Sequence, residues 1–175
     1  MIFKRLEQEQ VKEFKELMIA AFQYGYESYT KRKEEQVLPE SDIDKSLYNK
    51  NGHAYVMVDD NNMILGGLIV NINDDTNINY LDFIFVRVDS ESKGIGQAMW
   101  REVEKRYPQT IKWQTCTPYF DKRNIHFYVN KLGFKIIEYY NSHHKDPNEP
   151  VEENDEFFEE DGGMFEFEKR MKWGK

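Results

Sequence analysis

The chain has 175 residues, which is enough for one domain with a hydrophobic core and short for two. Hydrophobic residues make up 39% of it, and 12 Phe, 11 Tyr and 3 Trp predict an aromatic-rich core. A single cysteine, Cys116, excludes an internal disulfide, and no apolar run has the length of a signal sequence or a membrane span. We therefore expect a protein of the reducing cytoplasm.

The net charge of −8 is concentrated in one stretch of the sequence. Residues 146–161 contain nine carboxylates and neither Lys nor Arg, so the rest of the chain, with 24 basic and 23 acidic residues, is close to neutral. A solvated loop is the simpler interpretation of this stretch, and a lip that attracts cations is the alternative. We expect neither a nucleic-acid partner nor a membrane partner.

The first half of the chain predicts a strand, two helices and three further strands. Residues 2–6 alternate weakly, as an edge strand would, and residues 8–22 carry apolar side chains at helical spacing. Ser41 is suited to cap a short second helix. Three antiparallel strands joined by polar turns are then expected at residues 53–59, 63–73 and 78–89.

The second half of the chain predicts helices that alternate with strands. Ile95, Met99 and Val103 are spaced as one face of a helix. A further helix is predicted to begin at an N-cap, Asp121, and to end at a left-handed Gly133. The remaining strands are expected at residues 111–117, 134–140 and 164–171. This order of elements is typical of a mixed α/β or α+β layer structure.

The segment from Leu81 to Trp100 says most about function. It reads LDFIFVRVDSESKGIGQAMW, which is a strand, a polar turn, two glycines and the start of an amphipathic helix. The first backbone N–H groups of a helix have no partners within it, so this junction predicts an anion site that suits a phosphate. The alternative is a tight turn whose glycines allow close helix packing. The segment lacks the GxxxxGK[ST] loop of nucleoside triphosphatases and the three glycines of the dinucleotide fingerprint.

A second motif follows on the next predicted helix, where Asn124 precedes Tyr128 by four residues and the helix ends in Gly133 and Phe134. With these motifs the chain resembles the GNAT superfamily of acetyl-CoA-dependent N-acetyltransferases, over about residues 78–140. The resemblance implies a mixed, mostly antiparallel central sheet of six to seven strands with flanking helices. It also implies a single N-acetyltransferase domain over residues 1–175, with the acidic loop at about 142–162 inserted before the last strand. Acetyl-CoA is the implied co-substrate, and no metal is expected.

The resemblance also implies where the coenzyme lies. Backbone amides would wrap its diphosphate at Ser92, Lys93, Gly94, Ile95, Gly96 and Gln97. The pantetheine arm would pair with main-chain groups along the preceding strand and contact a side chain of the later helix, at Phe85, Val86, Val88 and Asn124. An amide near Val86 would polarise the thioester carbonyl. One position departs from the family pattern, because its Gln or Arg falls on Glu91, and we expect this carboxylate to face solvent or to contact Lys93.

Two residues are candidates for proton transfer. Tyr128 is the predicted general acid, because a phenol near the sulfur can protonate the leaving thiolate, and a position in the core is the alternative. Asp82 is the candidate general base, since a carboxylate in the apolar run YLDFIFV requires a reason. Even spacing places Asp82 on the face of Ile84 and Val86. A hydrogen bond to a neighbouring turn is the alternative explanation for Asp82, and relatives that use water relays offer a third.

The remaining polar and aromatic candidates predict less. His143 and His144 point to opposite faces if they lie on a strand, and no further ligand completes a metal set, so a solvated turn is the expectation. Cys116 is expected to be a buried small hydrophobe. The three tyrosines at positions 24, 26 and 29 could hold an ammonium group by cation–π contact, belong to the core or form the surface of a homodimer.

These observations define three functional hypotheses. The first is an enzyme that transfers acetyl from acetyl-CoA to a primary amine of a small molecule or peptide, by direct attack in a ternary complex. The second is a non-catalytic acyl-CoA sensor or interaction module on the same fold, which the carboxylate at Glu91 favours. The third is a nucleotide-phosphate binder, which the missing Lys-Ser/Thr pair disfavours.

Overall fold

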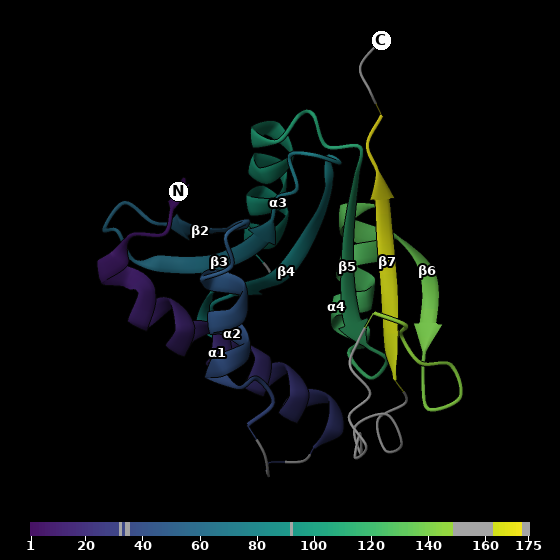
Figure 1. The fold of residues 1–175 in the computed structure, drawn as a ribbon. Helices are drawn as coiled ribbons and strands as arrows, with labels where there is room; N and C mark the ends of the chain where they lie inside the picture. The colour runs from purple at the N-terminus through teal and green to yellow at the C-terminus, as the bar shows by residue number, and fades with distance from the viewer. Residues whose placement is uncertain (32, 34–35, 92, 149–162, 173–175) are drawn as a thin grey trace.

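A computed structural model describes residues 1–31, 33, 36–91, 93–148 and 163–172 of the chain. One sheet joins seven strands in the order β1-β2-β3-β4-β5-β7-β6, and neighbouring strands are antiparallel except β4 with β5 (Figure 1). The strands are β1 (Ile2–Arg5), β2 (Gly52–Val58), β3 (Ile64–Asn71), β4 (Ile78–Val86), β5 (Lys112–Pro118), β6 (Lys135–Tyr140) and β7 (Met164–Arg170). The mixed, mostly antiparallel sheet of six to seven strands is thereby confirmed.

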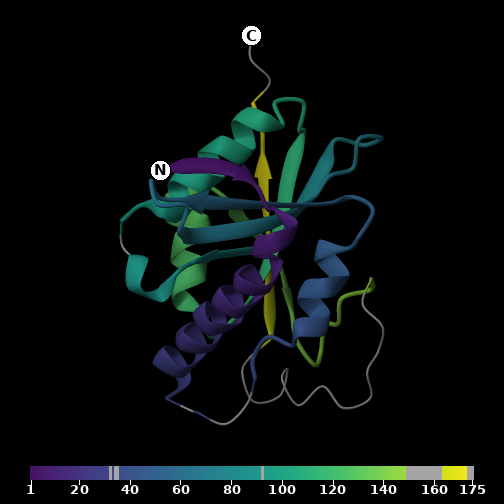
Figure 2. The same cartoon turned by 90° about the vertical axis from the view of Figure 1, so that its left-hand side faces the viewer.

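Helices cover both faces of the sheet (Figure 2). The helical elements are η1 (Gln8–Gln10), α1 (Val11–Thr30), α2 (Glu40–Leu47), η2 (Val88–Ser90), α3 (Ile95–Arg106), α4 (Lys122–His126) and the π-helical turn η3 (Phe127–Leu132) that continues α4. Helices α1 and α2 bury Phe14, Met18 and Ile43 against one face of the sheet. Helix α3 buries Met99 and Val103 against the other face, as their spacing predicts.

Large aromatic side chains fill the core on the α3 side of the sheet. Trp100 and Trp113 are almost fully buried and meet edge to face, with 5.1 Å between their ring centroids. Phe134 packs against Trp100, and Phe167 of β7 packs against Tyr128. The predicted aromatic-rich core is confirmed, and the large area that these rings bury stabilises the packing of the helices on the sheet.

The observed elements differ from the predicted ones mainly at their ends. Helix α1 continues to Thr30 rather than ending near residue 22, and α2 begins after Pro39, so Ser41 lies within the helix and is not its cap. Strand β4 ends at Val86, because a 3₁₀ turn follows at Val88–Ser90. Asp121 does cap α4, and Gly133 does end the following turn with a left-handed φ of 81°.

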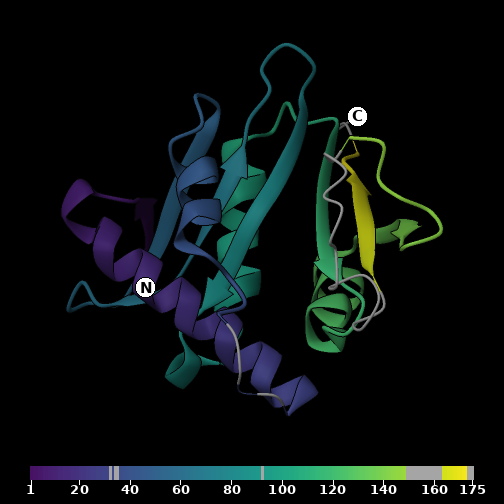
Figure 3. The same cartoon turned by 60° about the horizontal axis from the view of Figure 1, so that its bottom comes forward.

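Strands β4 and β5 pair over only a short length and then separate (Figure 3). The parallel register joins Ile78 to Lys112 and continues to Tyr80 opposite Gln114. Beyond Tyr80, the β5 side of β4 has no strand partner among the described residues. The main-chain groups of this free edge therefore need other partners, which a bound ligand can supply.

A β-bulge in β4 lies where the two strands separate. The register with β3 shifts between Ile69, which pairs with Phe83, and Val70, which pairs with Leu81. Asp82 is the extra residue, and such a residue reverses the alternation of side chains along its strand. Accordingly Ile84 packs on the α3 side, whereas Asp82 takes part in a hydrogen bond with Ser46 of α2 on the opposite face. The expectation that Asp82 shares the face of Ile84 is wrong for this reason.

Two further expectations from the sequence concern the acidic stretch and a membrane span. Most of the acidic stretch 146–161 falls outside the described residues, since positions 149–162 are not described. Within the part of the chain that is described, none of the helices combines the length and the apolar character that crossing a membrane requires.

Candidate active site

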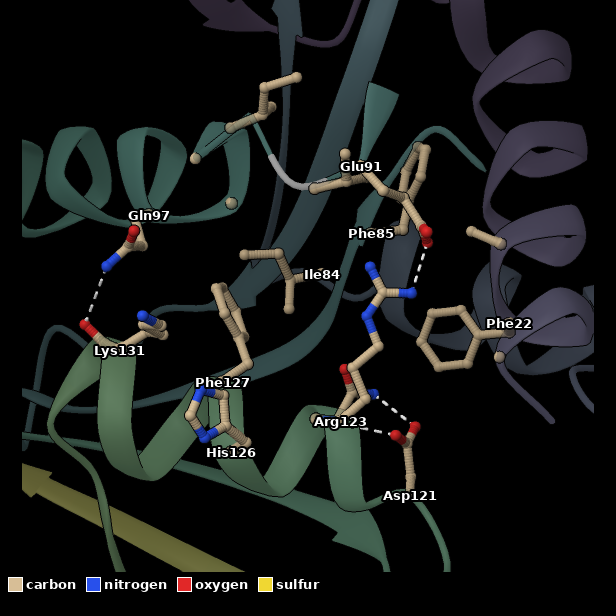
Figure 4. A pocket seen from close by; sticks show the side chains of 17 residues that line it. Phe22, Ile84, Phe85, Glu91, Gln97, Asp121, Arg123, His126, Phe127 and Lys131 are labelled. Carbon is tan, nitrogen blue, oxygen red and sulfur yellow. Dashed lines mark hydrogen bonds and ion pairs between the residues drawn. The ribbon is translucent and has the colours of Figure 1, made fainter. Parts of the chain in front are cut away.

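A cavity of about 470 Å³ lies along the free edge of β4, between the N-terminus of α3, the helix α4 and the helix α1 (Figure 4). Ile84, Phe85 and Val86 of β4 form its floor. The α3 side contributes Gly94, Ile95, Gly96 and Gln97, and the α4 side contributes Asp121, Arg123, Asn124, His126, Phe127 and Lys131. Two motifs 30 residues apart in the sequence, one at Gly94 and the other at Asn124, thus line the same cavity.

The N-terminus of α3 presents backbone donors to this cavity. Gly94 is the N-cap with a left-handed φ of 73°, and the first intrahelical bond is donated by Ala98 N–H to the Gly94 carbonyl, at 3.0 Å. The N–H groups of Ile95, Gly96 and Gln97 therefore precede the helical ladder and are free to bind an acceptor from outside the helix. Lys93 is described but is not among the lining residues, and Ser92 lies outside the described residues.

The two glycines are required for different reasons. A side chain on Gly94 would meet nothing within 4 Å, so this position needs glycine for its left-handed backbone. A Cβ on Gly96 would lie 2.8 Å from Cζ of Phe127, so glycine here admits the ring of Phe127. Close helix packing, the alternative explanation for the two glycines, is therefore present at Gly96, between α3 and the turn that continues α4.

The start of α4 orients Asn124 toward the cavity. The Asp121 carboxylate accepts hydrogen bonds from Asn124 N–H at 2.9 Å and from Asn124 Nδ2 at 2.7 Å. Because a carboxylate can only accept, Nδ2 is the donor, and the carbonyl oxygen Oδ1 of Asn124 is left to accept from a ligand. Burial raises the pKa of Asp121, and the Asn124 bonds and the charge of Arg123 partly oppose that rise.

Glu91 pairs with a residue that the sequence did not indicate. Its Oε1 lies 2.6 Å from Nη1 of Arg123, and Figure 4 shows the Arg123 side chain rising from α4 toward this carboxylate. The predicted contact with Lys93 or solvent is therefore wrong, because the guanidinium of Arg123 is within reach. Gln97 Nε2 also donates a hydrogen bond to the Lys131 carbonyl at 3.5 Å. This hydrogen bond and the Glu91–Arg123 ion pair both join the α3 side of the cavity to the α4 side.

Tyr128 lies in the core and is not among the residues that line the cavity. It is 5% exposed and packs against Phe127, Phe134 and Phe167. Burial raises the pKa of its phenol, and a hydrogen bond with Thr115 partly opposes that rise. Thr115 also donates to the Leu81 carbonyl at 2.9 Å, so the Tyr128 hydroxyl sits beside the point where β4 and β5 separate. Asn124 and Tyr128, although only four residues apart, thus face different surroundings.

Asp82 also lies where β4 and β5 separate, but on the face of the sheet that α2 covers. Burial raises the pKa of its carboxyl from 3.8 to about 6, and the hydrogen bond with Ser46 of α2 opposes the rise. Tyr80, two residues earlier, has its pKa raised by burial and by a hydrogen bond with Cys116. Asp82 and Tyr128 therefore approach the separation of β4 and β5 from its two sides.

Two of the three β4-side positions predicted to contact pantetheine line the cavity, and the third does not. Phe85 and Val86 lie on the strand that forms the floor of the cavity, and the Phe85 ring packs edge to face on Phe14. Val88 lies in the 3₁₀ turn after the strand, so its main chain does not continue the edge that an added strand would pair with. The edge available to a ligand therefore ends at Val86.

Several lining residues were not predicted from the sequence. Phe22 and Gly25 of α1 close the cavity on one side, and a Tyr26–Phe120 ring contact at 5.4 Å joins α1 to the segment after β5. Arg123 could have been identified from its position beside Asn124 and from the unusual carboxylate at Glu91. The α1 residues carry no such signal, because their side chains are typical of any amphipathic helix.

The remaining candidates lie away from the cavity. His144 Nε2 is 2.8 Å from the Glu138 carboxylate in a turn after β6. Cys116 is exposed rather than buried, because it projects from β5 where β4 has moved away. No group of three or more His, Cys, Asp or Glu side chains that could hold a metal ion occurs among the described residues.

Comparisons with known proteins identify the class to which this fold and site belong. Residues 11–134 match the acetyltransferase (GNAT) family, and the chain belongs to that family. YrkN of Bacillus subtilis (strain 168) is 42% identical over 135 residues, which is 76% of this chain and 72% of YrkN.

Solved structures show that the chain shares the fold of known acetyltransferases. Tetrahymena GCN5 superposes with a TM-score of 0.67 at 13% identity, covering 100% of this chain and 99% of its own. Spermidine N-acetyltransferase from Vibrio cholerae, solved with CoA and spermine, gives a TM-score of 0.66 at 12% identity, covering 97% and 94%. PaiA N-acetyltransferase from Thermoplasma acidophilum, solved with coenzyme A, gives 0.65 at 17% identity, covering 97% and 98%.

Proposed function

We propose that this chain is a single-domain N-acetyltransferase that moves the acetyl group of acetyl-CoA to a primary amine of a small molecule or peptide. The observation that carries the proposal is the cavity whose wall combines free helix N-terminal amides with the free edge of a strand. The amides suit a diphosphate, and the strand edge suits the amide groups of a pantetheine arm. Membership of the acetyltransferase (GNAT) family supports the same assignment.

In this proposal the coenzyme lies along the cavity from α3 toward the separation of β4 and β5. The amides of Gly94 to Gln97, with Lys93 and Ser92, bind the diphosphate. Phe85 and Val86 offer main-chain groups to pantetheine, and the Asn124 carbonyl oxygen accepts from one of its amides. The thioester then reaches the region beside Leu81 and Thr115, so we assign the polarising amide to the bulge of β4 and not to Val86, the position that the resemblance implied.

Tyr128 is the proposed general acid. Its hydroxyl lies next to Thr115 at the end of the proposed pantetheine path, and the phenol, whose pKa burial raises, carries its proton at neutral pH. The amine nitrogen attacks the thioester carbonyl, the carbon–sulfur bond of the tetrahedral intermediate breaks, and the departing thiolate takes the phenolic proton. Since Tyr128 is buried before the coenzyme binds, the role requires the sulfur to reach it from the strand edge.

Asp82 is the proposed general base. A pKa of about 6 leaves this carboxylate ionised at neutral pH yet basic enough to accept a proton from an ammonium group during attack. Its face of the sheet also carries Tyr80 and exposed Cys116, and β7 places Glu166 opposite Cys116. If the acceptor amine approaches from this face of the sheet, the carboxylates and tyrosines there favour a cationic amine. The Vibrio cholerae relative named above acts on spermidine, which is an amine of this kind.

A non-catalytic acyl-CoA sensor on the same fold is the second candidate function. Two observations favour it, namely the carboxylate at Glu91 and the burial of Tyr128 away from the cavity. A sensor would bind acetyl-CoA without releasing free coenzyme in the presence of amines. The enzyme would bind it and release thiol with at least one amine.

Two measurements test the proposal. A thermal-shift comparison of acetyl-CoA with ATP is expected to show stabilisation by acetyl-CoA alone, because the residues of a triphosphate loop are lacking. Thiol release from acetyl-CoA is then followed over a library of polyamines, aminoglycosides, amino acids and peptide amines. Release with a cationic amine supports the enzyme, whereas coenzyme binding without release across the library supports the sensor. Stabilisation by neither nucleotide contradicts both.

A further inference from the structure

The ion pair between Glu91 and Arg123 connects two elements that the proposed coenzyme must pass between. Glu91 belongs to the segment just before α3, and Arg123 belongs to the first turn of α4. Both residues line the cavity, and Nη1 of Arg123 lies 2.6 Å from Oε1 of Glu91. Figure 4 shows this pair on the opposite side of Phe127 from the Gln97–Lys131 contact. The pair therefore closes one end of the space between α3 and α4.

The other charged groups of the cavity leave Glu91 as the main competitor for Arg123. Asp121 also lies near this guanidinium, but its two oxygens accept from the backbone and the side chain of Asn124. His126 and Lys131 add basic groups on the α4 side. Apart from Glu91 and Asp121, none of the described residues that line the cavity carries a carboxylate. The carboxylate of Glu91 is thus the anion that this basic wall holds in the described structure.

We propose that Arg123 is a ligand of the coenzyme diphosphate and that Glu91 is an internal anion which the diphosphate displaces. This inference rests on the proposed function, because it requires the coenzyme to occupy the cavity. Without coenzyme, Glu91 neutralises Arg123 and holds it across the space. When the coenzyme binds, Arg123 exchanges the carboxylate for the diphosphate, and Glu91 turns away toward solvent. Arg123 of α4 then supplies the side-chain donor that the Gln or Arg of the family pattern would supply from the turn before α3.

The exchange is favourable on physical grounds. A diphosphate offers more negative charge and more acceptor oxygens than one carboxylate, and the planar guanidinium binds phosphate oxygens in pairs. The Arg123 side chain is 48% exposed and that of Glu91 is 21% exposed, so water screens their attraction and the pair is easily exchanged. Displacing Glu91 costs part of the free energy of coenzyme binding, and its negative charge stays close to the diphosphate even after it turns toward solvent. Glu91 therefore lowers the affinity of the chain for the coenzyme.

The proposed exchange predicts that neutralising Glu91 and neutralising Arg123 change the affinity for coenzyme A in opposite directions. Glu91→Gln removes the competitor and is expected to lower the dissociation constant of coenzyme A about two- to fivefold. Arg123→Gln removes a charge-assisted bond to phosphate and is expected to raise the constant about tenfold. In the double variant, Glu91→Gln is expected to gain less than it does alone, because there is no longer an arginine to release.

Calorimetric titration of coenzyme A into the full-length chain tests the inference, with thermal unfolding to establish that each variant is folded. Glu102 and Lys105 provide a matched control, because their ion pair on α3 also measures 2.6 Å and neither residue lines the cavity. Glu102→Gln and Lys105→Gln make the same charge changes and are expected to leave the dissociation constant unchanged. 3′-Dephospho-coenzyme A serves as a second ligand, since it keeps the diphosphate and lacks the 3′-phosphate.

The outcomes separate this inference from the proposed function. It is supported if Glu91→Gln tightens binding, Arg123→Gln weakens it, and both effects persist with 3′-dephospho-coenzyme A. Weaker or unchanged binding after Glu91→Gln overturns it, and so does an Arg123→Gln effect that disappears with 3′-dephospho-coenzyme A, which would place Arg123 on the 3′-phosphate. Failure of the unmodified chain to bind coenzyme A overturns the proposed function, and this inference with it.

Discussion

Replacing Asp82 by asparagine is expected to stabilise the fold at alkaline pH while it lowers activity. Asp82 lies at the bulge of β4, where burial holds its carboxyl pKa near 6 instead of 3.8. Asparagine has the same shape, carries no charge, and can still bond to Ser46 through its amide. The substitution therefore removes the cost of burying the ionised group and leaves the packing nearly unchanged.

The size of the effect follows from the two pKa values. Because the folded state holds this proton more tightly, the folded chain binds more protons than the unfolded chain between pH 3.8 and about 6. The free energy of unfolding therefore falls as pH rises through this window, by at most about 3 kcal/mol. Asp82→Asn should match the unmodified chain near pH 4 and exceed it by about 1–3 kcal/mol at pH 8.

Urea unfolding of both chains at pH 4, 6 and 8 measures this difference, and acetyl transfer is assayed over the same range. If Asp82 is the base, kcat/KM of the unmodified chain rises with pH through about 6. The variant should lose this rise and about 100-fold or more in rate. A difference in stability that is the same at every pH would refute the assigned burial cost. An unchanged pH profile in the variant would refute the role as base.

Three further substitutions test the other parts of the site. Tyr128→Phe should lower kcat about 100-fold and leave the coenzyme dissociation constant unchanged, whereas full activity in stopped-flow thiol release would return Tyr128 to a purely structural role. Gly94→Ala should cost about 1 kcal/mol in urea unfolding because its φ is 73°, and an unaffected stability would contradict the left-handed cap. Gly96→Ala should displace the Phe127 ring and weaken coenzyme binding in calorimetry, and equal affinity would show that the ring's position is immaterial.

Much of the fold could be predicted because local patterns and tertiary structure agree. The spacing of Ile95, Met99 and Val103 predicts the buried face of α3, and all three side chains are buried. Asp121 and Gly133 mark the start and the end of the second site helix, because a cap and a left-handed terminus depend on nearby backbone atoms alone.

The sequence could not predict features that depend on distant segments. The bulge at Asp82 depends on the register with β3, and a shift of one residue places the carboxylate on the opposite face from the one that even spacing predicts. The partner of Glu91 is 32 residues away on α4, so only the folded chain brings Arg123 to it. Gly96 likewise meets Phe127 only because α3 and the turn after α4 pack together.

The placement of the coenzyme diphosphate at the N-terminus of α3 is the central claim, and a crystal structure of the chain with coenzyme A tests it most directly. The diphosphate oxygens are expected within hydrogen-bond distance of the amides of Ile95, Gly96 and Gln97, with pantetheine along β4 toward Tyr128. Coenzyme bound elsewhere on the chain, or an empty cavity at saturating coenzyme, would contradict the account.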